Sequence, residues 1–306
     1  MELSDYYFPR TVSSFYKYAI IENPAEFQKE HFEFCKSLNL TGRILVGEEG
    51  INGSVCGAKE DAEEYKDYLR NDPLFHDVEF KDSVSLKPAF RKLFVRVRKE
   101  IVHLGVKVDM GKTGRFISPK ELRDMLDNKE DFTLLDVRNN YETKIGKFKD
   151  AVTLDIDKFR DLPDAIGQIR HIKEKKIVAY CTGGIRCEKA SAYLAENGFN
   201  NVHQLKGGIL NFGIDCPDTY WEGLCFVFDD RLAVAININR NNDYAFIKCE
   251  WCSRINCSYL NCHNISCDRL FIACGYCIEK HRASCSQECE KSPNRRKKGA
   301  MPEYAN

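Results

Sequence analysis

The chain has 306 residues, which suggests two or three domains, and its hydrophobic content of 43% is enough to build buried cores. Lys and Arg total 46, as do Asp and Glu, so the formal net charge is zero; this excludes an overall polycation but allows a local basic patch for nucleic acid. There is no apolar run of about 18 residues, and the N-terminal sequence lacks the pattern of a signal peptide. We therefore expect a cytoplasmic protein that has no membrane partner.

Strand-like and helix-like patterns alternate through residues 1–105. The expected elements are a strand at 14–21, a helix at 25–39, two strands within 42–57, a helix at 59–71, and strands at 78–80 and 92–104. The pair Asn23-Pro24 marks the start of the first helix. This order of elements predicts a ferredoxin-like, or acylphosphatase-like, α+β domain over residues 1–105.

A second pattern covers residues 118–216, after a predicted linker at 106–117. Ser118, Pro119 and Glu121 are the cap, first-turn proline and third-position acid of a helix start. Apolar strands are expected at 132–138, 175–181 and 201–209, and a helix at 188–198. Strands that alternate with helices indicate an α/β domain whose parallel sheet is covered on both faces.

The remainder of the chain is of a different kind. Residues 217–290 are first aromatic and then rich in cysteine, and residues 291–306 are basic and lack an apolar pattern. We expect the first of these segments to be held by zinc and the second to be a disordered tail.

The residues after the strand at 175–181 form the motif that bears most directly on chemistry. The loop consists of Cys181, Thr182, Gly183, Gly184, Ile185 and Arg186, with Cys187 next. Ligands bind at the carboxyl edge of a parallel sheet, where Cys181 would lie. Small residues let backbone N–H groups converge on one atom, the following helix presents its positive end, and Arg186 adds a full charge. These effects favour a thiolate, so we predict Cys181 and Arg186 as catalytic. The alternative is a buried cysteine that ends a core strand.

This loop resembles that of the rhodanese family, and the resemblance covers roughly residues 118–215. Four residues separate Cys181 from Arg186. Dual-specificity phosphatases of similar fold have one residue more, sized for a phosphate, so the shorter loop suits a persulfide sulfur. Asp136 and Arg138 match a segment that braces the fold in rhodaneses, and we interpret them as supporting residues. Further matches are Glu142, Gly146 and Gly207-Gly208. Cys187 is either a resolving thiol or a small packing residue.

A basic stretch lies at residues 81–120. It contains eleven Lys or Arg residues and three acids, and Phe90 and Phe94 lie among its arginines. Guanidinium groups beside aromatic rings are typical of RNA-binding surfaces. The residues predicted to bind RNA are Arg91, Lys92, Arg96, Arg98 and Lys99. An ordinary solvated strand and linker is the alternative.

Nine of the 15 cysteines lie between Cys249 and Cys289. Two Cys-x-x-Cys pairs are typical of zinc ligands, so one or two structural Zn²⁺ ions are expected; disulfides are the alternative. In one grouping Cys249 and Cys252 join Cys274 and Cys277. The second, interleaved site would then use Cys262, Cys267, Cys285 and Cys289. A sequential pairing is also possible. Cys257 is the expected spare, and His263 or His281 could replace a thiolate.

The combination of all three parts resembles the tRNA uridine-34 5-hydroxylase family of rhodanese-domain proteins. The stretches that carry the resemblance are RILVGEEGINGSV (43–55), FRKLFVRVRKEIV (90–102), YCTGGIRCEKAS (180–191), KGGI (206–209) and FVFDDRLAV (226–234). The resemblance implies a tRNA-modifying enzyme that binds the anticodon region and uses molecular oxygen to form 5-hydroxyuridine at the wobble position. Two alternatives stay open: a sulfurtransferase that carries a persulfide on Cys181, and a non-enzymatic zinc-containing adaptor.

Overall fold

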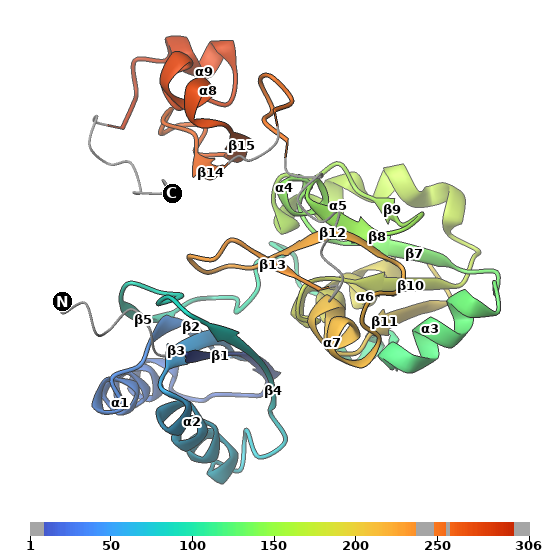
Figure 1. The fold of residues 1–306 in the computed structure, drawn as a ribbon. Helices are drawn as coiled ribbons and strands as arrows, with labels where there is room; N and C mark the ends of the chain where they lie inside the picture. The colour runs from blue at the N-terminus through green and yellow to red at the C-terminus, as the bar shows by residue number, and fades with distance from the viewer. Residues whose placement is uncertain (1–8, 237–247, 255–257, 297–306) are drawn as a thin grey trace.

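A computed structural model describes residues 9–236, 248–254 and 258–296, and it contains an N-terminal, a central and a C-terminal unit (Figure 1). The N-terminal sheet has five strands in the order β4-β1-β3-β2-β5. Its elements are β1 (Arg10–Tyr18), α1 (Pro24–Ser37), β2 (Thr41–Gly47), β3 (Gly50–Gly57), α2 (Lys59–Asn71), β4 (Glu79–Ser85) and β5 (Leu93–Val97). The first four strands have the antiparallel ferredoxin-like arrangement that the sequence predicted, and β5 adds a parallel strand beside β2.

Strand β5 is shorter than the predicted strand at 92–104. After Val97 the chain leaves the sheet, because Ile101 and Leu104 turn inward and are fully buried. The Glu100 carboxylate accepts hydrogen bonds from the N–H groups of Leu104 and Gly105, which fixes this turn. The apolar alternation of the sequence is therefore real, but its second half packs between units instead of pairing in a sheet.

The two faces of the N-terminal sheet differ. Helices α1 and α2 cover one face (Figure 1). On that face Phe15, Ile44 and Val95 join the core. Successive residues of a strand point to opposite faces, so Ser14 and Tyr16 lie on the other face. Lys81 is directly opposite Ser14 on the neighbouring strand and shares that face. The second face is thus polar and aromatic, and it points toward the rest of the molecule.

The central sheet has five parallel strands in the order β6-β11-β10-β7-β9. Its strands are β6 (Arg115–Ile117), β7 (Thr133–Asp136), β9 (Val152–Thr153), β10 (Ile177–Tyr180) and β11 (Val202–Leu205). The helices are α3 (Pro119–Asp127), α4 (Asn140–Thr143), α5 (Leu162–Ala165), α6 (Ile185–Glu196) and α7 (Gly208–Asp215), with 3-10 turns at Met110–Lys112, Phe159–Asp161 and Ile166–Ile172. Two buried clusters cover the two faces, as expected for a parallel sheet. The predicted linker ends in β6, which pairs with β11.

The chain then forms a small three-stranded sheet in the order β13-β12-β8, from β8 (Gly146–Phe148), β12 (Trp221–Phe226) and β13 (Ala233–Ala235). The C-terminal unit contains the hairpin of β14 (Ser258–Asn261) and β15 (Leu270–Ala273), followed by α8 (Gly275–Lys280) and α9 (Gln287–Lys291). Within the described part of the chain, no helix is long and apolar enough to cross a membrane. The predicted disordered tail at 291–306 is only partly described: Arg295 donates a hydrogen bond to the Cys289 carbonyl, so this part is ordered, whereas residues 297–306 lie outside the described residues.

Candidate active site

Cys181 lies directly after β10, at the carboxyl edge of the central sheet, as the sequence predicted. Cys181 is fully buried, yet it is one of the residues that line a cleft between the units. The N–H group of Gly184 donates a hydrogen bond to Sγ of Cys181 at 3.1 Å. Gly184 has a φ of 102° and forms the N-cap of α6, a conformation that favours glycine. The loop therefore closes around the sulfur atom.

Helix α6 begins at Ile185, three residues earlier than the predicted start at residue 188. The sequence offers no Ser, Thr or Asp cap at this point, and the positive φ of Gly184 performs the turn instead. The earlier start places Ile185, Arg186 and Cys187 in the first turn of the helix. The positive end of the helix therefore faces Cys181 more closely than expected.

The surroundings of Cys181 stabilise its thiolate. Burial raises the pKa of this thiol, but the Cys187 side chain, the Arg186 guanidinium and the N–H groups of Arg186 and Gly184 outweigh burial and lower the pKa to about 5. Burial and the neighbouring Cys181 raise the pKa of Cys187 well above its usual range. At neutral pH the pair therefore consists of one thiolate and one thiol.

Arg186 is held by a buried carboxylate. Its Nη1 and Nη2 atoms lie 2.5 and 2.8 Å from the two carboxylate oxygens of Glu142, and Nη2 also donates to Oγ1 of Thr182 at 3.3 Å. Glu142 and Arg186 are both buried, so the pair is shielded from water. Arg186 thus fixes the loop and lowers the pKa of Cys181, while its donors are directed at Glu142 and Thr182.

The first residues of α7 are hydrogen-bonded to the same loop. Ile209 and Leu210 donate N–H hydrogen bonds to the carbonyl groups of Cys181 and Thr182, at 3.0 and 3.1 Å. A Cβ atom on Gly208 would lie 2.4 Å from the Cys181 oxygen, and the φ of Gly208 is 65°. Only glycine fits this contact at position 208. Gly207 has a φ of 71°, and a Cβ atom there would lie 1.9 Å from the Asn211 side chain.

Asp136 and Arg138 form a fully buried ion pair below the loop. Nε and Nη2 of Arg138 donate to the two oxygens of Asp136 at 2.9 and 2.6 Å, and Nη2 also donates to the Gly146 carbonyl at 2.8 Å. The Arg138 guanidinium lies over the Trp221 ring at 5.2 Å. These contacts join β7, β8 and β12.

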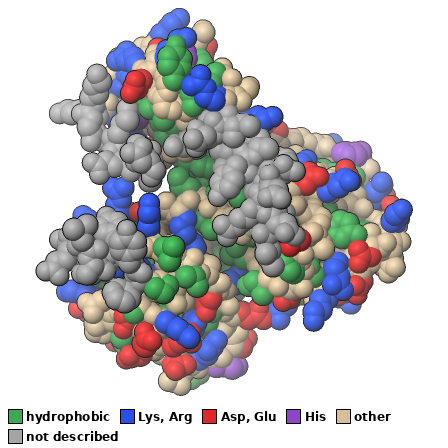
Figure 2. Space-filling view, viewed as in Figure 1, with side chains coloured by type: hydrophobic (Ala, Val, Ile, Leu, Met, Phe, Trp, Pro, Cys, Tyr) green, Lys and Arg blue, Asp and Glu red, His purple; other side chains and the backbone are tan. Residues whose placement is uncertain are grey.

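The cleft in front of Cys181 has a volume of about 1230 Å³ and is lined by all three units. Its aromatic and basic lining residues are Phe15, Tyr16, Phe90, Tyr141, Phe159, Phe226, Phe228, Arg43, Lys81, Arg98, Lys99, Lys158, Arg160, Arg186 and Arg269. In Figure 2, basic side chains gather where the N-terminal unit meets the other two. Small-molecule pockets measure roughly 300–1,000 Å³, so this cleft has room for more than one small molecule.

Contacts between units hold the N-terminal sheet over the loop. Tyr16 donates its hydroxyl hydrogen to Glu188 at 3.2 Å, and Lys189 Nζ lies 2.8 Å from carboxylate oxygens of both Glu49 and Glu100. Lys189 is buried, so this charged triad is a fixed part of the interface. A further contact between the units comes from Arg231, between β12 and β13, which donates a hydrogen bond of 2.8 Å to Oγ of Ser83 in β4.

These interface residues and Glu142 are absent from the predicted site. In the sequence, Glu142 matches the rhodanese pattern but carries no predicted role. Asn139 and Glu142 also form a capping box, which signals a helix start but gives no sign of the partner Arg186. Tyr16 alternates with Phe15 in an aromatic strand, but only the three-dimensional arrangement shows which face meets Cys181.

The predicted RNA-binding residues are all exposed and lie on or beside β5. Arg98 and Lys99 line the cleft. The Arg96 guanidinium lies over the Phe94 ring at 4.8 Å, and Arg91 lies 3.5 Å from Asp230. Lys92 precedes the strand. The basic residues are thus divided between the cleft and the adjacent edge of the sheet.

The C-terminal unit brings eight cysteines into two groups of four. Within each group the sulfur atoms lie within 4.8 Å of one another: Cys249, Cys252, Cys274 and Cys277 form one, and Cys262, Cys267, Cys285 and Cys289 the other. This is the interleaved grouping of the two that the spacing allowed. Four thiols at such distances fit a tetrahedral Zn²⁺ ion. Cys257 lies outside the described residues. The His281 ring stacks on Trp251 at 3.6 Å, and neither His281 nor His263 belongs to a group.

Three family models match the chain in order: the UPF0176 acylphosphatase like domain at residues 10–101, the Rhodanese-like domain at 118–214, and the Rhodanase C-terminal model at 222–290. The tRNA uridine(34) hydroxylase of Cytophaga hutchinsonii is 43% identical over 297 residues, which cover 95% of this chain and 94% of that protein. The tRNA uridine(34) hydroxylase of Enterococcus faecalis is 44% identical over 92% of this chain and 90% of that protein. Among solved structures, a rhodanese-like domain from Anabaena is 24% identical over 36% of this chain and 80% of that chain, with a TM-score of 0.31.

Proposed function

Since the chain belongs to the tRNA uridine(34) hydroxylase family, we propose that it is an enzyme that forms 5-hydroxyuridine at position 34, in the anticodon region of cytoplasmic tRNA. The observation that carries this proposal is the position of the Cys181 thiolate at the end of a basic and aromatic cleft. Aromatic rings can stack on an unpaired base, and arginine and lysine can bind the flanking phosphates.

The chemistry that we propose begins with Cys181. A thiolate adds to C6 of uridine, and the electron pair of the C5–C6 bond then makes C5 nucleophilic, so that C5 can react with molecular oxygen. The N–H donors and the cation around the loop would keep Cys181 ionised before it reacts. Arg186 acts through its contacts with Glu142 and Thr182, so we assign it a positioning role.

The two cysteine groups are proposed to hold structural zinc. Each would supply four thiolates and leave no open position on the ion, so the expected role is to cross-link the C-terminal unit. The β14–β15 connection lines the cleft through Cys267, Asp268 and Arg269. Zinc would therefore shape one wall of the RNA site without taking part in the reaction.

Replacement of Cys181 by Ser tests the function most directly. We expect Cys181→Ser to lower 5-hydroxyuridine formation by roughly a thousandfold or more, because a hydroxyl group is not ionised at neutral pH. Nucleoside mass spectrometry on an unmodified tRNA transcript, incubated with protein and a thiol reductant in air, measures the product. Normal hydroxylation by Cys181→Ser would contradict the proposal. Rapid transfer of sulfur from thiosulfate to cyanide, without hydroxylation, would instead favour the sulfurtransferase.

A further inference from the structure

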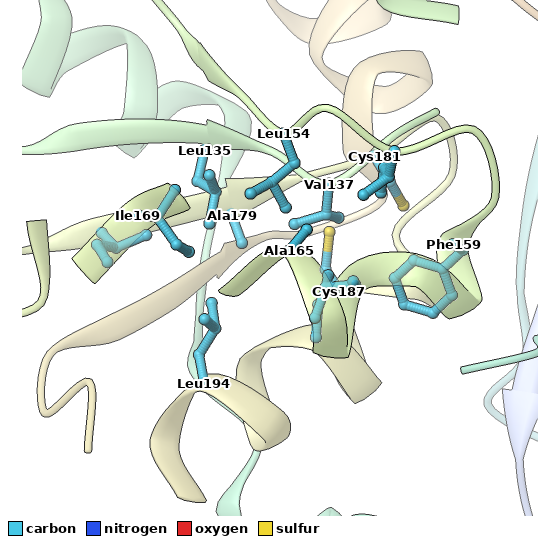
Figure 3. Packing of buried hydrophobic residues seen from close by; sticks show 14 of the residues in the cluster. Leu135, Val137, Leu154, Phe159, Ala165, Ile169, Ala179, Cys181, Cys187 and Leu194 are labelled. Carbon is cyan, nitrogen blue, oxygen red and sulfur yellow. The ribbon is translucent and has the colours of Figure 1, made fainter. Parts of the chain in front are cut away.

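A second thiol, that of Cys187, lies directly after the loop in the first turn of α6 and has no role in the proposed chemistry so far. Cys187 is fully buried and belongs to the same core cluster as Cys181, together with Val137, Phe159 and Ala165 (Figure 3). Gly184 connects the two cysteines: its N–H group donates to Sγ of Cys181 at 3.1 Å, and its carbonyl accepts from the Cys187 N–H group at 3.0 Å. The Cys187 side chain is also the largest of the influences that lower the pKa of Cys181.

Hydroxylation by molecular oxygen needs an electron source. One oxygen atom enters the product and the other leaves as water, so each turnover consumes two electrons and two protons. Two neighbouring thiols release two electrons and two protons when they become a disulfide. The overall reaction of uridine, oxygen and two thiols to 5-hydroxyuridine, water and a disulfide is balanced in atoms and electrons.

We propose that Cys187 is a second catalytic residue, and that Cys181 and Cys187 together supply the two electrons and end each turnover as a disulfide. This inference rests on the proposed function and deepens it by naming the reductant. An external dithiol would then reduce the disulfide and restore both thiols by exchange.

Each step can be written with its bonds. Cys181 adds to C6, C5 attacks oxygen, and a proton completes a C5 hydroperoxide. Cys187 loses its proton, and its thiolate attacks the outer oxygen. The O–O bond breaks, Cys187 becomes a sulfenic acid, and the alkoxide left on C5 takes up the proton that Cys187 released and becomes a hydroxyl group. Loss of the C5 proton then expels Cys181 from C6 and restores the ring double bond. Finally, Cys181 attacks the sulfenic acid, which forms the disulfide and releases water.

The surroundings of Cys187 suit this order of events. While Cys181 is a thiolate, its charge and the burial of Cys187 keep Cys187 protonated. Once Cys181 is bonded to the base it carries no charge, so only burial and more distant acids oppose ionisation of Cys187. The Arg186 guanidinium, which lowers the pKa of Cys187, remains in place. Cys187 therefore becomes more nucleophilic only after the base has been captured.

A single-turnover experiment tests the inference. The full-length, metal-loaded protein is reduced, freed of reductant without air, and mixed with tRNA transcript in oxygenated buffer. We expect about one equivalent of 5-hydroxyuridine per protein, with an equal amount of Cys181–Cys187 disulfide. Trypsin cleaves after Lys176, Arg186 and Lys189, so the disulfide joins peptides 177–186 and 187–189. Mass spectrometry identifies this linked pair separately from the cysteines of the zinc groups.

The matched variants are Cys187→Ala and Cys35→Ala, since both residues are fully buried cysteines and only Cys187 shares a core cluster with Cys181. We expect Cys187→Ala to lose product roughly tenfold or more in the single turnover, and Cys35→Ala to match the wild type. If Cys187→Ala does not fold, Cys187→Ser takes its place. The test for the disulfide-linked peptides is made on the wild-type protein and needs no variant.

The outcomes separate the two proposals. Equal product from Cys187→Ala and the wild type would overturn the role of Cys187 and leave the hydroxylase intact. Product without the linked peptide, or a linked peptide that forms equally fast without tRNA, would overturn it as well. If the wild type makes no 5-hydroxyuridine even with excess dithiothreitol, the proposed function itself fails.

Discussion

Cysteine occurs in two contrasting settings in this molecule. In the loop at 181–186, one sulfur receives backbone N–H groups and the influence of a buried arginine, all supplied by the protein itself. In the C-terminal unit, eight cysteine sulfur atoms lie in two compact groups. In one of these groups the Sγ atoms of Cys252 and Cys274 are 3.7 Å apart. The loop lowers the pKa of one thiol with groups of the protein alone, whereas each group of four thiols has the spacing that could hold a metal ion. The same residue type is therefore placed in two different electrostatic surroundings, and this difference underlies the two roles that we propose.

The largest effect should follow removal of metal from the C-terminal unit. Structural zinc contributes on the order of 10 kcal/mol to small zinc domains, so chelation should unfold this unit. We expect two Zn²⁺ ions per chain, eight thiols that become reactive on chelation, and faster proteolysis of residues 248–296. A zinc-sensitive dye and thiol titration measure these changes. Cys181 should react with iodoacetamide as before, and a strong change in its rate would show that the two regions are coupled.

A smaller effect should appear in the pH dependence of Cys181. Because its pKa is lowered to about 5, the thiolate fraction should be constant above about pH 6 and fall as pH decreases through 5. The rate of iodoacetamide labelling of peptide 177–186 measures this fraction. In the unfolded protein the midpoint should move up to about 8.5, the value of an ordinary cysteine. A midpoint near 8.5 in the folded protein would mean that the loop does not stabilise the charge.

The smallest effect should come from replacing a basic residue that lies outside the Cys181 loop and outside the two cysteine groups. Arg96→Ala should weaken tRNA binding by a factor of about 3–10 and lower the salt dependence by about one phosphate contact. Lys36→Ala is the control, because Lys36 is exposed on α1, which covers the other face of the same sheet. Filter binding at several salt concentrations measures both variants. Equal losses from the two substitutions would indicate general charge attraction.

Local features of the fold were predictable because they depend on residues close in the chain. Ser118 caps α3 by accepting the Glu121 N–H hydrogen bond, as its motif predicts, and α2 spans 59–71 as expected. The loop with Cys181 was also found from a short segment. Such signals arise from hydrogen bonds and periodicities that span only a few residues.

Long-range contacts were not predictable in the same way. Glu142 and Arg186 are 44 residues apart, and the triad of Glu49, Glu100 and Lys189 joins two units. Nothing in the local pattern distinguishes these charges from solvated ones. The predicted strand at 92–104 ends early for a related reason, since Ile101 and Leu104 are fully buried and Leu104 joins the core of the central unit. Burial of this kind is decided by the whole fold.

The hydrogen bonds and close contacts between the start of α7 and the loop limit how this site could be redesigned. Gly208 lies against the carbonyl groups of Cys181 and Thr182. A Cβ atom at position 208 would be only 2.4 Å from the carbonyl oxygen of Cys181. A loop lengthened by one residue, as in the phosphatases of similar fold, would have to displace the first turn of α7. An engineer who wished to admit a phosphate here would therefore have to rebuild residues 206–210 together with the loop. The first turn of α7, whose Leu210 also lines the cleft, therefore limits how far the loop can be enlarged.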